Sequence, residues 1–273
     1  MGRVTDPGGV AYVLPRHPSE LDRLDIQHYA LRELMQRNYL APAEMPAAIL
    51  DVGSGTGQWA FDLCAELPHA KVVGLDLVVG KPGPPANYRF VQANVLQGLP
   101  FRADSFDFVH QRFLTAGLPL KSWSGVVQDL VRVTRPGGWV ELVEAAPWIE
   151  PAGPATARLS ELAWRLGMAH GLDTTGIVFR SLDERLRRAG MSDVEKQQVD
   201  LPIGEWGGRI GSFMASDFRA VFTRLSDVFQ ARFDISAIEC HALVRTMQLE
   251  WEQNHSGLNM IFAFGRKPER SQS

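Results

Sequence analysis

The sequence predicts an α/β fold: a doubly wound, mostly parallel sheet of seven strands with helices on both faces. From residue 47 onward, short apolar runs alternate with stretches of helical apolar spacing. A glycine-rich segment directly follows the first run and opens one of the helical stretches. Repeated strand, helix and strand indicate a parallel sheet, because each connecting helix covers one of its faces.

The length permits one large domain or two small ones. With 273 residues, 45% of them hydrophobic, the chain can bury a sizeable core. Since the predicted strands complete one sheet, we expect a single domain over residues 1–273. Its expected parts are a tail and cap helix (1–46), a cofactor-binding core (47–144), the rest of the sheet (145–204 and 257–267) and a helical lid or substrate insertion (205–256).

The first part of the chain is predicted as a tail followed by a helix. Residues 1–18 are rich in Gly and Pro, and a helix is expected over 20–39. Ser19 and Asp22 form a variant of the capping box at its start, and residues 41–42 (Ala-Pro) end it. This helix is expected to act as a cap.

The remaining elements follow from apolar runs and helical spacing. The predicted strands are 48–52, 70–75, 88–92, 106–109, 138–143, 195–201 and 258–264. The predicted helices are 58–67, 124–132, 155–169, 181–189 and one long stretch over 211–253. That stretch separates the last two strands, so we expect an insertion at one end of the sheet that builds or covers a binding site.

Charge and cysteine content narrow the class of protein. A net charge of −3 and a pI of about 6.2 weakly oppose nucleic-acid binding, which needs a basic surface. Cys64 and Cys240 cannot form a disulfide framework or a zinc site, and the scattered histidines predict no metal site. Without a signal-peptide pattern or a run of about 18 apolar residues, we expect a cytoplasmic protein with no membrane partner.

The glycine-rich segment is the first motif that carries chemistry. Residues 51–57 read Asp-Val-Gly-Ser-Gly-Thr-Gly, with glycines at Gly53, Gly55 and Gly57. Glycines let the backbone approach a bound nucleotide, and free N–H groups at the helix start are expected to face the ligand. A dinucleotide fingerprint opening at Gly53 needs its last glycine where Gln58 stands. The spacing therefore favours S-adenosylmethionine (SAM) over NAD.

A carboxylate ends the second predicted strand. Asp76 follows Gly57 by about 20 residues, the separation at which an acidic residue accepts ribose hydrogen bonds in dinucleotide folds. We therefore expect Asp76 to bind the cofactor ribose and Leu77 to lie against the adenine.

In their order and spacing, these motifs resemble those of class I SAM-dependent methyltransferases. Besides the glycine motif and Asp76, the resemblance is carried by residues 92–101, 104–109 and 135–139. It implies a Rossmann-like sheet and SAM as the cofactor. It also implies that Asn94 contacts the adenine amino group and that the Val95 backbone lies on the ring. Asp is commoner than Asn at that position, but the Asn oxygen can accept the same hydrogen bond.

Flanking segments resemble the LaeA-like branch of that family, which includes fungal regulators of secondary metabolism and bacterial small-molecule methyltransferases. These segments are residues 12–15, 20–28, 108–114 and 201–206. In that branch the helix before the first strand closes over the cofactor. The resemblance therefore makes Arg23, Gln27 and His28 candidates for contacts with the cofactor carboxylate or the substrate.

A general base is needed only if the acceptor atom still carries a proton. The candidates are His110 after the fourth strand, Glu144 after the fifth, and His28 on the cap helix. Each has a structural alternative. His28 can fill a helix interface, His110 can touch the cofactor through its backbone, and Glu144 can bind backbone N–H groups of the following loop.

Three further polar residues are candidates for the methionine portion of the cofactor. Asp51 is expected to order the glycine loop or to bind the amino group. Gln111 and Arg112 can reach the carboxylate, but for Arg112 a structural ion pair is favoured.

Aromatic residues of the second half favour an apolar or aromatic acceptor. They are Trp148, Trp164, Trp206, Phe213, Phe218, Phe222 and Trp251. We expect transfer of a methyl group to O, N or C of a small, natural-product-like molecule by in-line displacement, with a homodimer possible. The alternative is a SAM-binding regulatory partner protein of LaeA type. A pocket under 211–253 would favour the enzyme, and a large exposed apolar patch there would favour the regulator.

Overall fold

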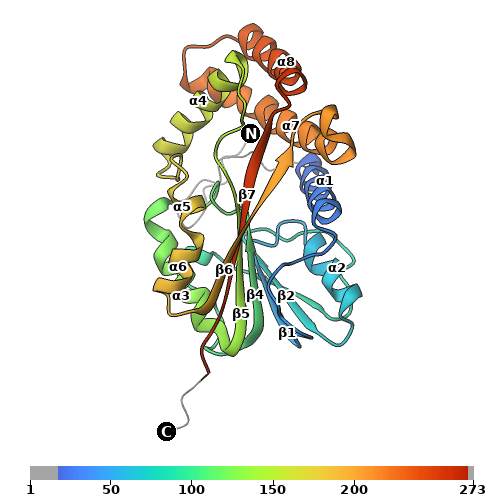
Figure 1. The fold of residues 1–273 in the computed structure, drawn as a ribbon, viewed down its shortest axis with the longest axis vertical. Coiled ribbons are helices and arrows are strands. Elements are labelled where there is room, and N and C mark those ends of the chain that lie inside the picture. Colours follow the sequence, from blue (N-terminus) through green and yellow to red (C-terminus); the bar gives the residue numbers. More distant parts are fainter. Residues whose placement is uncertain (1–17, 270–273) are drawn as a thin grey trace.

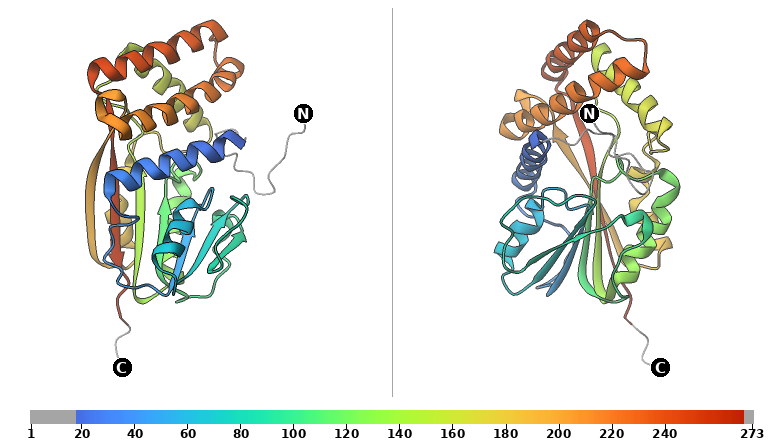
Figure 2. Two further views of the ribbon diagram at one scale, coloured as in Figure 1. Left: turned by 90° about the vertical axis from the view of Figure 1, so that its right-hand side faces the viewer. Right: turned by 180° about the vertical axis from the view of Figure 1, so that it is seen from behind.

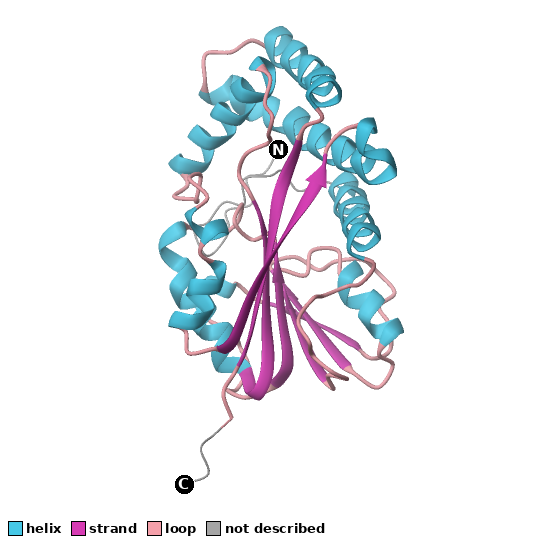
Figure 3. Ribbon diagram, in the orientation of Figure 1, coloured by secondary structure: helices cyan, strands magenta, loops and turns pink. Residues whose placement is uncertain are grey.

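A computed structural model describes residues 18–269, which contain a seven-stranded sheet (Figures 1 and 3). The strands are β1 (Ala48–Val52), β2 (Lys71–Asp76), β3 (Tyr88–Gln92), β4 (Phe106–Arg112), β5 (Thr134–Ala145), β6 (Ser192–Pro202) and β7 (Gly257–Arg266). Their order is β3-β2-β1-β4-β5-β7-β6, and β7 alone runs antiparallel to its neighbours within the described sheet. The predicted fold class is confirmed. The tail expected before residue 18, with the segment 12–15, lies outside the described residues.

The helices agree with the predicted segments except in three places, the first of which is the helix expected over 20–39: it ends at Met35, because Gln36 has a left-handed φ of +56°. They are α1 (Pro18–Met35), α2 (Gln58–Glu66), α3 (Trp123–Val133), α4 (Pro154–Ala169), α5 (Ile177–Arg180), α6 (Leu182–Arg188), α7 (Gly208–Arg232) and α8 (Ala237–Asn254). α5 was not predicted. The long stretch predicted over 211–253 is two helices, because Ser236 accepts a hydrogen bond from the Glu239 N–H at 3.1 Å and caps the start of α8.

Two helical layers cover the two faces of the sheet (Figure 2). On the face covered by α3, α5 and α6, the core includes Leu50, Val109, Trp123 and Leu142. On the face covered by α2, the core includes Ile49, Trp59, Leu63 and Phe108. Neighbouring residues of one strand thus belong to different cores, as the alternation of side chains along a strand requires. The same alternation decides which polar side chains can meet at the strand ends.

A third layer lies beyond the carboxyl ends of the parallel strands, where α4, α7 and α8 form a helical cluster (Figure 1). α1 packs against α7 and lies between α7 and α2 (Figure 2). Glu250 of α8 accepts backbone N–H bonds from Ala155 and Thr156 at 2.8 and 2.7 Å, which joins α8 to the start of α4. The insertion is therefore at the expected end of the sheet, and it supports α1.

Candidate functional site

A cavity of about 470 Å³ lies at the carboxyl ends of β1, β2 and β4 and is bounded by α1. Of the residues singled out from the sequence, its lining includes Gln27, His28, Asp51, Gly53, Gly55, Asp76, Leu77, Asn94, Val95 and His110. Arg23, Gly57, Gln111 and Glu144 lie outside that lining. The cavity thus joins the glycine loop and the second-strand carboxylate to the cap helix.

The glycine loop forms one wall of the cavity. Gly53, Gly55 and Gly57 have φ angles of +76°, +55° and +84°, a region that residues with side chains rarely adopt. The N–H groups of Gly53 and Ser54 donate to the carbonyl of Leu75, and that of Gly57 donates to Ser54. These amides precede the helix start, and the expectation that free N–H groups at the start of α2 face the ligand stays a prediction. The hydrogen bonds of these amides fix the shape of the loop. The loop contributes to the site by letting its backbone come close to a bound ligand.

Asp76 joins the glycine loop to the end of β2. Its Oδ2 accepts a hydrogen bond from the Gly55 N–H at 2.9 Å, and its Oδ1 accepts one from the Val78 N–H at 3.2 Å. The carboxylate therefore orders two loops in addition to lining the cavity. Its position at the cavity is the one that the predicted contact with the cofactor ribose requires.

Leu77, Asn94 and Val95 form the adjacent part of the lining. Asn94 Oδ1 accepts a hydrogen bond from the Leu96 N–H at 3.0 Å and begins the short helix η1 (Val95–Gln97). The Gln92 amide donates to the carbonyl of Leu77 at 2.8 Å. The apolar side chain of Leu77 suits the face of a flat ring, and the side-chain amide of Asn94 suits polar atoms at the edge of that ring.

A buried cluster of ionisable groups lies where β1, β4 and β5 are adjacent. His110 Nδ1 is 3.2 Å from Asp51 Oδ1, and His110 Nε2 is 3.9 Å from Glu141 Oε1. The indole of Trp59 stacks on the imidazole of His110. Burial lowers the pKa of His110, and burial raises the pKa of Glu141 to about 7. The imidazole of His110 is thus enclosed and bonded to Asp51.

Gln111 and Glu144 lie on the face of the sheet opposite His110, because they alternate with the residues that point toward α2. Glu144 accepts hydrogen bonds from the Leu114 N–H at 2.8 Å and from the Thr115 hydroxyl at 2.5 Å. Burial raises the pKa of Glu144 to about 7. Glu144 thus anchors the loop after β4, whereas the structural alternative to a base named the loop that follows Glu144 itself.

Arg23 and Gln27 bind the insertion. Arg23 Nη1 donates to Asp217 Oδ1 at 2.5 Å, and Gln27 Nε2 donates to Asp217 Oδ2 at 3.2 Å. Asp217 on α7 is 2% exposed, and burial raises its pKa although Arg23 opposes that shift. These bonds join α1 to α7, and Gln27 also lines the cavity.

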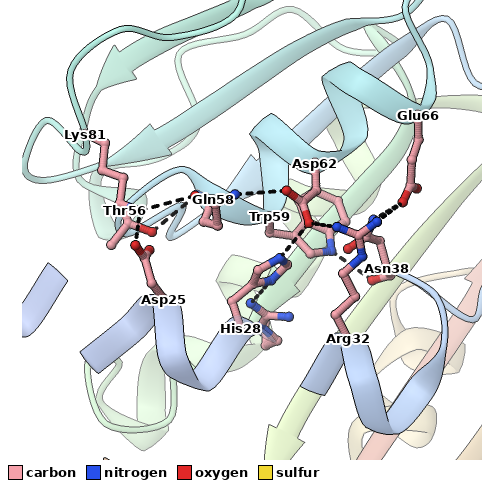
Figure 4. A network of polar contacts seen from close by, with 11 residues as sticks. Asp25, His28, Arg32, Asn38, Thr56, Gln58, Trp59, Asp62, Glu66 and Lys81 are labelled. Atoms are coloured by element: carbon pink, nitrogen blue, oxygen red, sulfur yellow. Dashed lines mark hydrogen bonds and ion pairs between the residues drawn. The ribbon is translucent and has the colours of Figure 1, made fainter. Parts of the chain in front are cut away.

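His28 belongs to a polar network between α1 and α2 (Figure 4). Its Nε2 is 3.1 Å from Asp62 Oδ2, and its Nδ1 is 3.3 Å from Arg112 Nη2. Lys81 pairs with Asp25 of α1 and donates to Gln58 at the start of α2 at 3.2 Å.

Sequence reasoning did not single out Trp59 or Asp62 as site residues. The only signal for Asp62 was an acidic residue one turn after Gln58 on an otherwise apolar helix.

The strand order, the glycine loop and the carboxylate at the end of β2 define the architecture of class I methyltransferases. A model of the methyltransferase domain matches residues 49–138. The most similar proteins named here include methyltransferase str2 of Strobilurus tenacellus, which is 34% identical over 202 residues, covering 70% of this chain and 71% of that protein.

Two further relatives match this chain over only part of their own length. Methyltransferase pytC of Aspergillus terreus is 32% identical over 207 residues, which cover 72% of this chain and 62% of pytC. The secondary metabolism regulator laeA of Aspergillus fumigatus is 29% identical over 205 residues, which cover 71% of this chain and 54% of laeA. The chain therefore spans less than two thirds of either protein.

A solved structure shares the fold. Phosphoethanolamine N-methyltransferase 2 of Haemonchus contortus, in complex with S-adenosylhomocysteine, superposes with a TM-score of 0.54 at 18% identity, covering 91% of this chain and 52% of that one. The secondary metabolism regulator LAE1 of Cochliobolus heterostrophus is 30% identical over 210 residues, which cover 71% of this chain and 67% of LAE1. Together with str2, it shows that the chain belongs to the class I SAM-dependent methyltransferases, in their LaeA-like branch. None of the helices between residues 18 and 269 has the length and apolar composition needed to cross a bilayer.

Proposed function

We propose that the protein transfers the methyl group of SAM to O, N or C of a small, mainly apolar or aromatic acceptor. The observation that carries this proposal is one continuous cavity, in which the cofactor-motif residues meet apolar side chains such as Leu24, Phe113 and Leu118. Methyl transfer from a sulfonium depends on alignment and on exclusion of water, and the cofactor itself supplies the activated methyl group. A mainly apolar cavity bounded by α1 suits those needs.

The residues present fit SAM. The carboxylate of Asp76 suits the ribose hydroxyls, and the turn at Asn94 and Val95 suits the adenine. Asp51, held by His110, offers a carboxylate to the cofactor's ammonium group. In this proposal the chain binds and orients the cofactor, and α1 excludes water from the reacting atoms.

The three candidate bases are engaged with other groups. Both ring nitrogens of His28 have polar partners, His110 is stacked and bonded to Asp51, and Glu144 anchors a loop. The proposed acceptor is therefore one whose reacting atom is nucleophilic without a dedicated base from these residues.

A second candidate function is that of a regulatory partner protein, and two observations favour it. The lining of this cavity includes no residue of 211–253, under which we expected a pocket, and it lies under α1 instead. A second cavity of about 490 Å³ touches the insertion at Trp206, Gly207 and His255 but likewise includes no residue of 211–253. On α8, Ile238 and Leu249 are 82% and 61% exposed, and their spacing of three turns puts them on one helix face. That face suits contact with another protein or with a second copy of this chain.

We also propose a reducing, cytoplasmic location and no nucleic-acid partner. Cys64 and Cys240 are both buried and unpaired, which suits a reducing compartment. The mildly acidic balance of the sequence offers little attraction to a polyanion.

Two measurements test these proposals. The first is calorimetric titration of the full chain with S-adenosylhomocysteine and with NAD; binding of NAD alone would overturn the methyltransferase. The second is incubation with isotopically labelled SAM and an extract of the source cells. A labelled small molecule supports the enzyme. SAM binding with no labelled small molecule, together with a stable complex lost in an Ile238→Asp variant, supports the regulator.

A further inference from the structure

The Arg112 guanidinium lies at the cavity in the field of two carboxylates, Asp51 and Glu141, but among residues 18–269 it forms no ion pair within 4.0 Å with either. Its polar contact is with the ring of His28, 3.3 Å from Nη2. A guanidinium carries five N–H donors, so this contact leaves most of them without a partner among residues 18–269. The structural ion pair that the sequence allowed for Arg112 is therefore not formed there. A cation of this kind at a cavity suits an anionic ligand.

The His28 ring has one defined protonation state, and in that state it accepts a hydrogen bond from Arg112. Because Nδ1 accepts from Arg112, it carries no proton, and the proton on Nε2 faces Asp62 Oδ2 at 3.1 Å. Burial lowers the pKa of His28 more than the hydrogen bond to Asp62 raises it, which keeps the ring neutral. The neutral ring can then accept from Arg112 without adding a second positive charge.

Asp62 in turn fixes His28 (Figure 4). Gln58 donates to its Oδ1 at 2.9 Å, and Arg32 donates to its Oδ2. Partial burial raises the pKa of Asp62, but hydrogen bonds from His28 and Gln58 outweigh it and leave the pKa lowered. With donors on both oxygens, the carboxylate has one orientation, and that orientation selects the His28 tautomer.

The charges at the strand ends match an amino acid. Asp51, one residue before the end of β1, pairs in register with His110 of β4, and Arg112 lies two residues further along β4 on the same face. The cavity thus offers a carboxylate and a guanidinium at adjacent strand ends. A zwitterionic amino-acid group carries the complementary pair of charges, and the methionine portion of SAM is such a group.

We propose that Arg112 binds the carboxylate of the cofactor's methionine portion, and that His28 and Asp62 are positioning residues that hold its guanidinium toward the cavity. This inference rests on the proposed function, since it takes SAM as the ligand. It gives His28 a role in binding instead of proton transfer, and it gives a role to Asp62 on the neighbouring helix.

The test compares two ligands that differ only in the carboxylate, SAM and decarboxylated SAM, by calorimetric titration of the full chain. Arg112→Met is expected to weaken SAM binding about tenfold or more and to change the affinity for decarboxylated SAM by less than about twofold. Arg112→Lys keeps the positive charge but loses the planar set of paired N–H donors of the guanidinium. It should retain part of the SAM affinity. Arg209→Met removes an ion pair between α7 and Glu33 of α1 and should leave both affinities unchanged.

A matched pair of variants tests the positioning role. His28→Phe keeps a ring but removes the acceptor, and is expected to weaken SAM binding about threefold to tenfold while sparing decarboxylated SAM. His28→Gln restores an acceptor for Arg112 and should recover affinity to within about twofold of the parent protein. A merely structural role for His28 would affect both ligands equally and would not distinguish the two variants.

The outcomes separate this inference from the proposed function. If the parent protein binds neither ligand, the proposed function fails and this inference fails with it. If it binds SAM no more tightly than decarboxylated SAM, or if Arg112→Met weakens both equally, the carboxylate assignment alone is overturned. Should Arg112→Met fail to fold, the comparison of the two ligands on the parent and on the His28 pair decides the question.

Discussion

The indole of Trp59 lies flat against the imidazole of His110, with ring centroids 3.8 Å apart and planes 10° from parallel. His110 is 1% exposed and its Nδ1 is bonded to Asp51, so the stack and the hydrogen bond together fix the Asp51 carboxylate at the cavity. A buried, stacked ring is poorly placed to take a proton from an acceptor. Its effect is on the binding of the cofactor.

Variants of His110 separate the stack from the hydrogen bond. His110→Ala removes both and is expected to lower the free energy of unfolding by about 2–4 kcal/mol, because it leaves a cavity beside Trp59. His110→Phe keeps a ring on Trp59 and should cost only about 1–2 kcal/mol, from the lost bond to Asp51. Denaturant unfolding checks both values. Both variants should weaken SAM binding by a similar factor in calorimetry; His110→Phe with parental SAM affinity would show that the bond to Asp51 does not matter.

Asp76 is expected to contribute to cofactor binding in two ways, by contact with the ribose and by its bond to the Gly55 N–H. Asp76→Ala should therefore weaken S-adenosylhomocysteine binding by about 1–3 kcal/mol in calorimetric titration. Asp200→Ala, on the far edge strand β6, removes a carboxylate that binds Asn259 and serves as the control. Equal affinity of parent and Asp76→Ala would contradict the ribose assignment.

Local patterns predicted the sheet well because strands and the glycine loop are specified by nearby residues. The predicted strand over 48–52 matches β1, and the loop at 53–57 lies at the cavity as expected. The division between α7 and α8 was also predictable, since Ser236 and Glu239 have the spacing of a capping box.

Tertiary contacts could not be predicted in the same way. Arg23 is predicted to contact the cofactor or substrate, but it binds Asp217, 194 residues away on α7. Nothing in the spacing of either residue indicates that contact. Gln111 and Glu144 each lie one residue before the end of a strand, yet the alternation of side chains turns them to the face opposite His110. A shift of one residue in register reverses such an assignment.

Glu141 is expected to make stability depend on pH. Its Oε2 accepts the backbone N–H groups of Leu40 and Ala41, both at 2.7 Å, and burial raises its pKa from 4.5 to about 7. Because the folded pKa is above the unfolded one, the folded state binds more protons between these values. The stability from protonated Glu141 is therefore lost as the pH rises through 7.

Glu141→Gln keeps an oxygen for both backbone N–H groups and cannot ionise. Relative to the parent, its free energy of unfolding should be similar at pH 5 and higher by about 1–3 kcal/mol at pH 8. Denaturant unfolding at the two pH values gives the difference. Exposed Glu161, changed to Gln, should show no such trend. A Glu141→Gln variant that loses stability as the pH rises from 5 to 8 relative to the parent would refute the raised pKa.

Glu250 is expected to stabilise the start of α4 from a distance of 94 and 95 residues in sequence. It is 8% exposed, and it accepts the N–H groups of Ala155 and Thr156 and the Thr156 hydroxyl at 2.7–2.8 Å. Glu250→Ala leaves buried donors of the first helical turn without partners. It should lower the free energy of unfolding by about 2–4 kcal/mol.

The control for Glu250 is Glu252, which binds the N–H groups of Glu205 and Trp206 at an exposed site. Glu252→Ala should cost only about 0.5–1 kcal/mol, since water replaces the lost acceptor. Denaturant unfolding measures both variants, and SAM titration should find the affinity of each unchanged, because neither residue lines the cavity. Equal losses from Glu250→Ala and Glu252→Ala would mean that burial does not strengthen the contact with α4. A loss of SAM affinity in Glu250→Ala would instead mean that α4 and α8 support the cavity through α7 and α1.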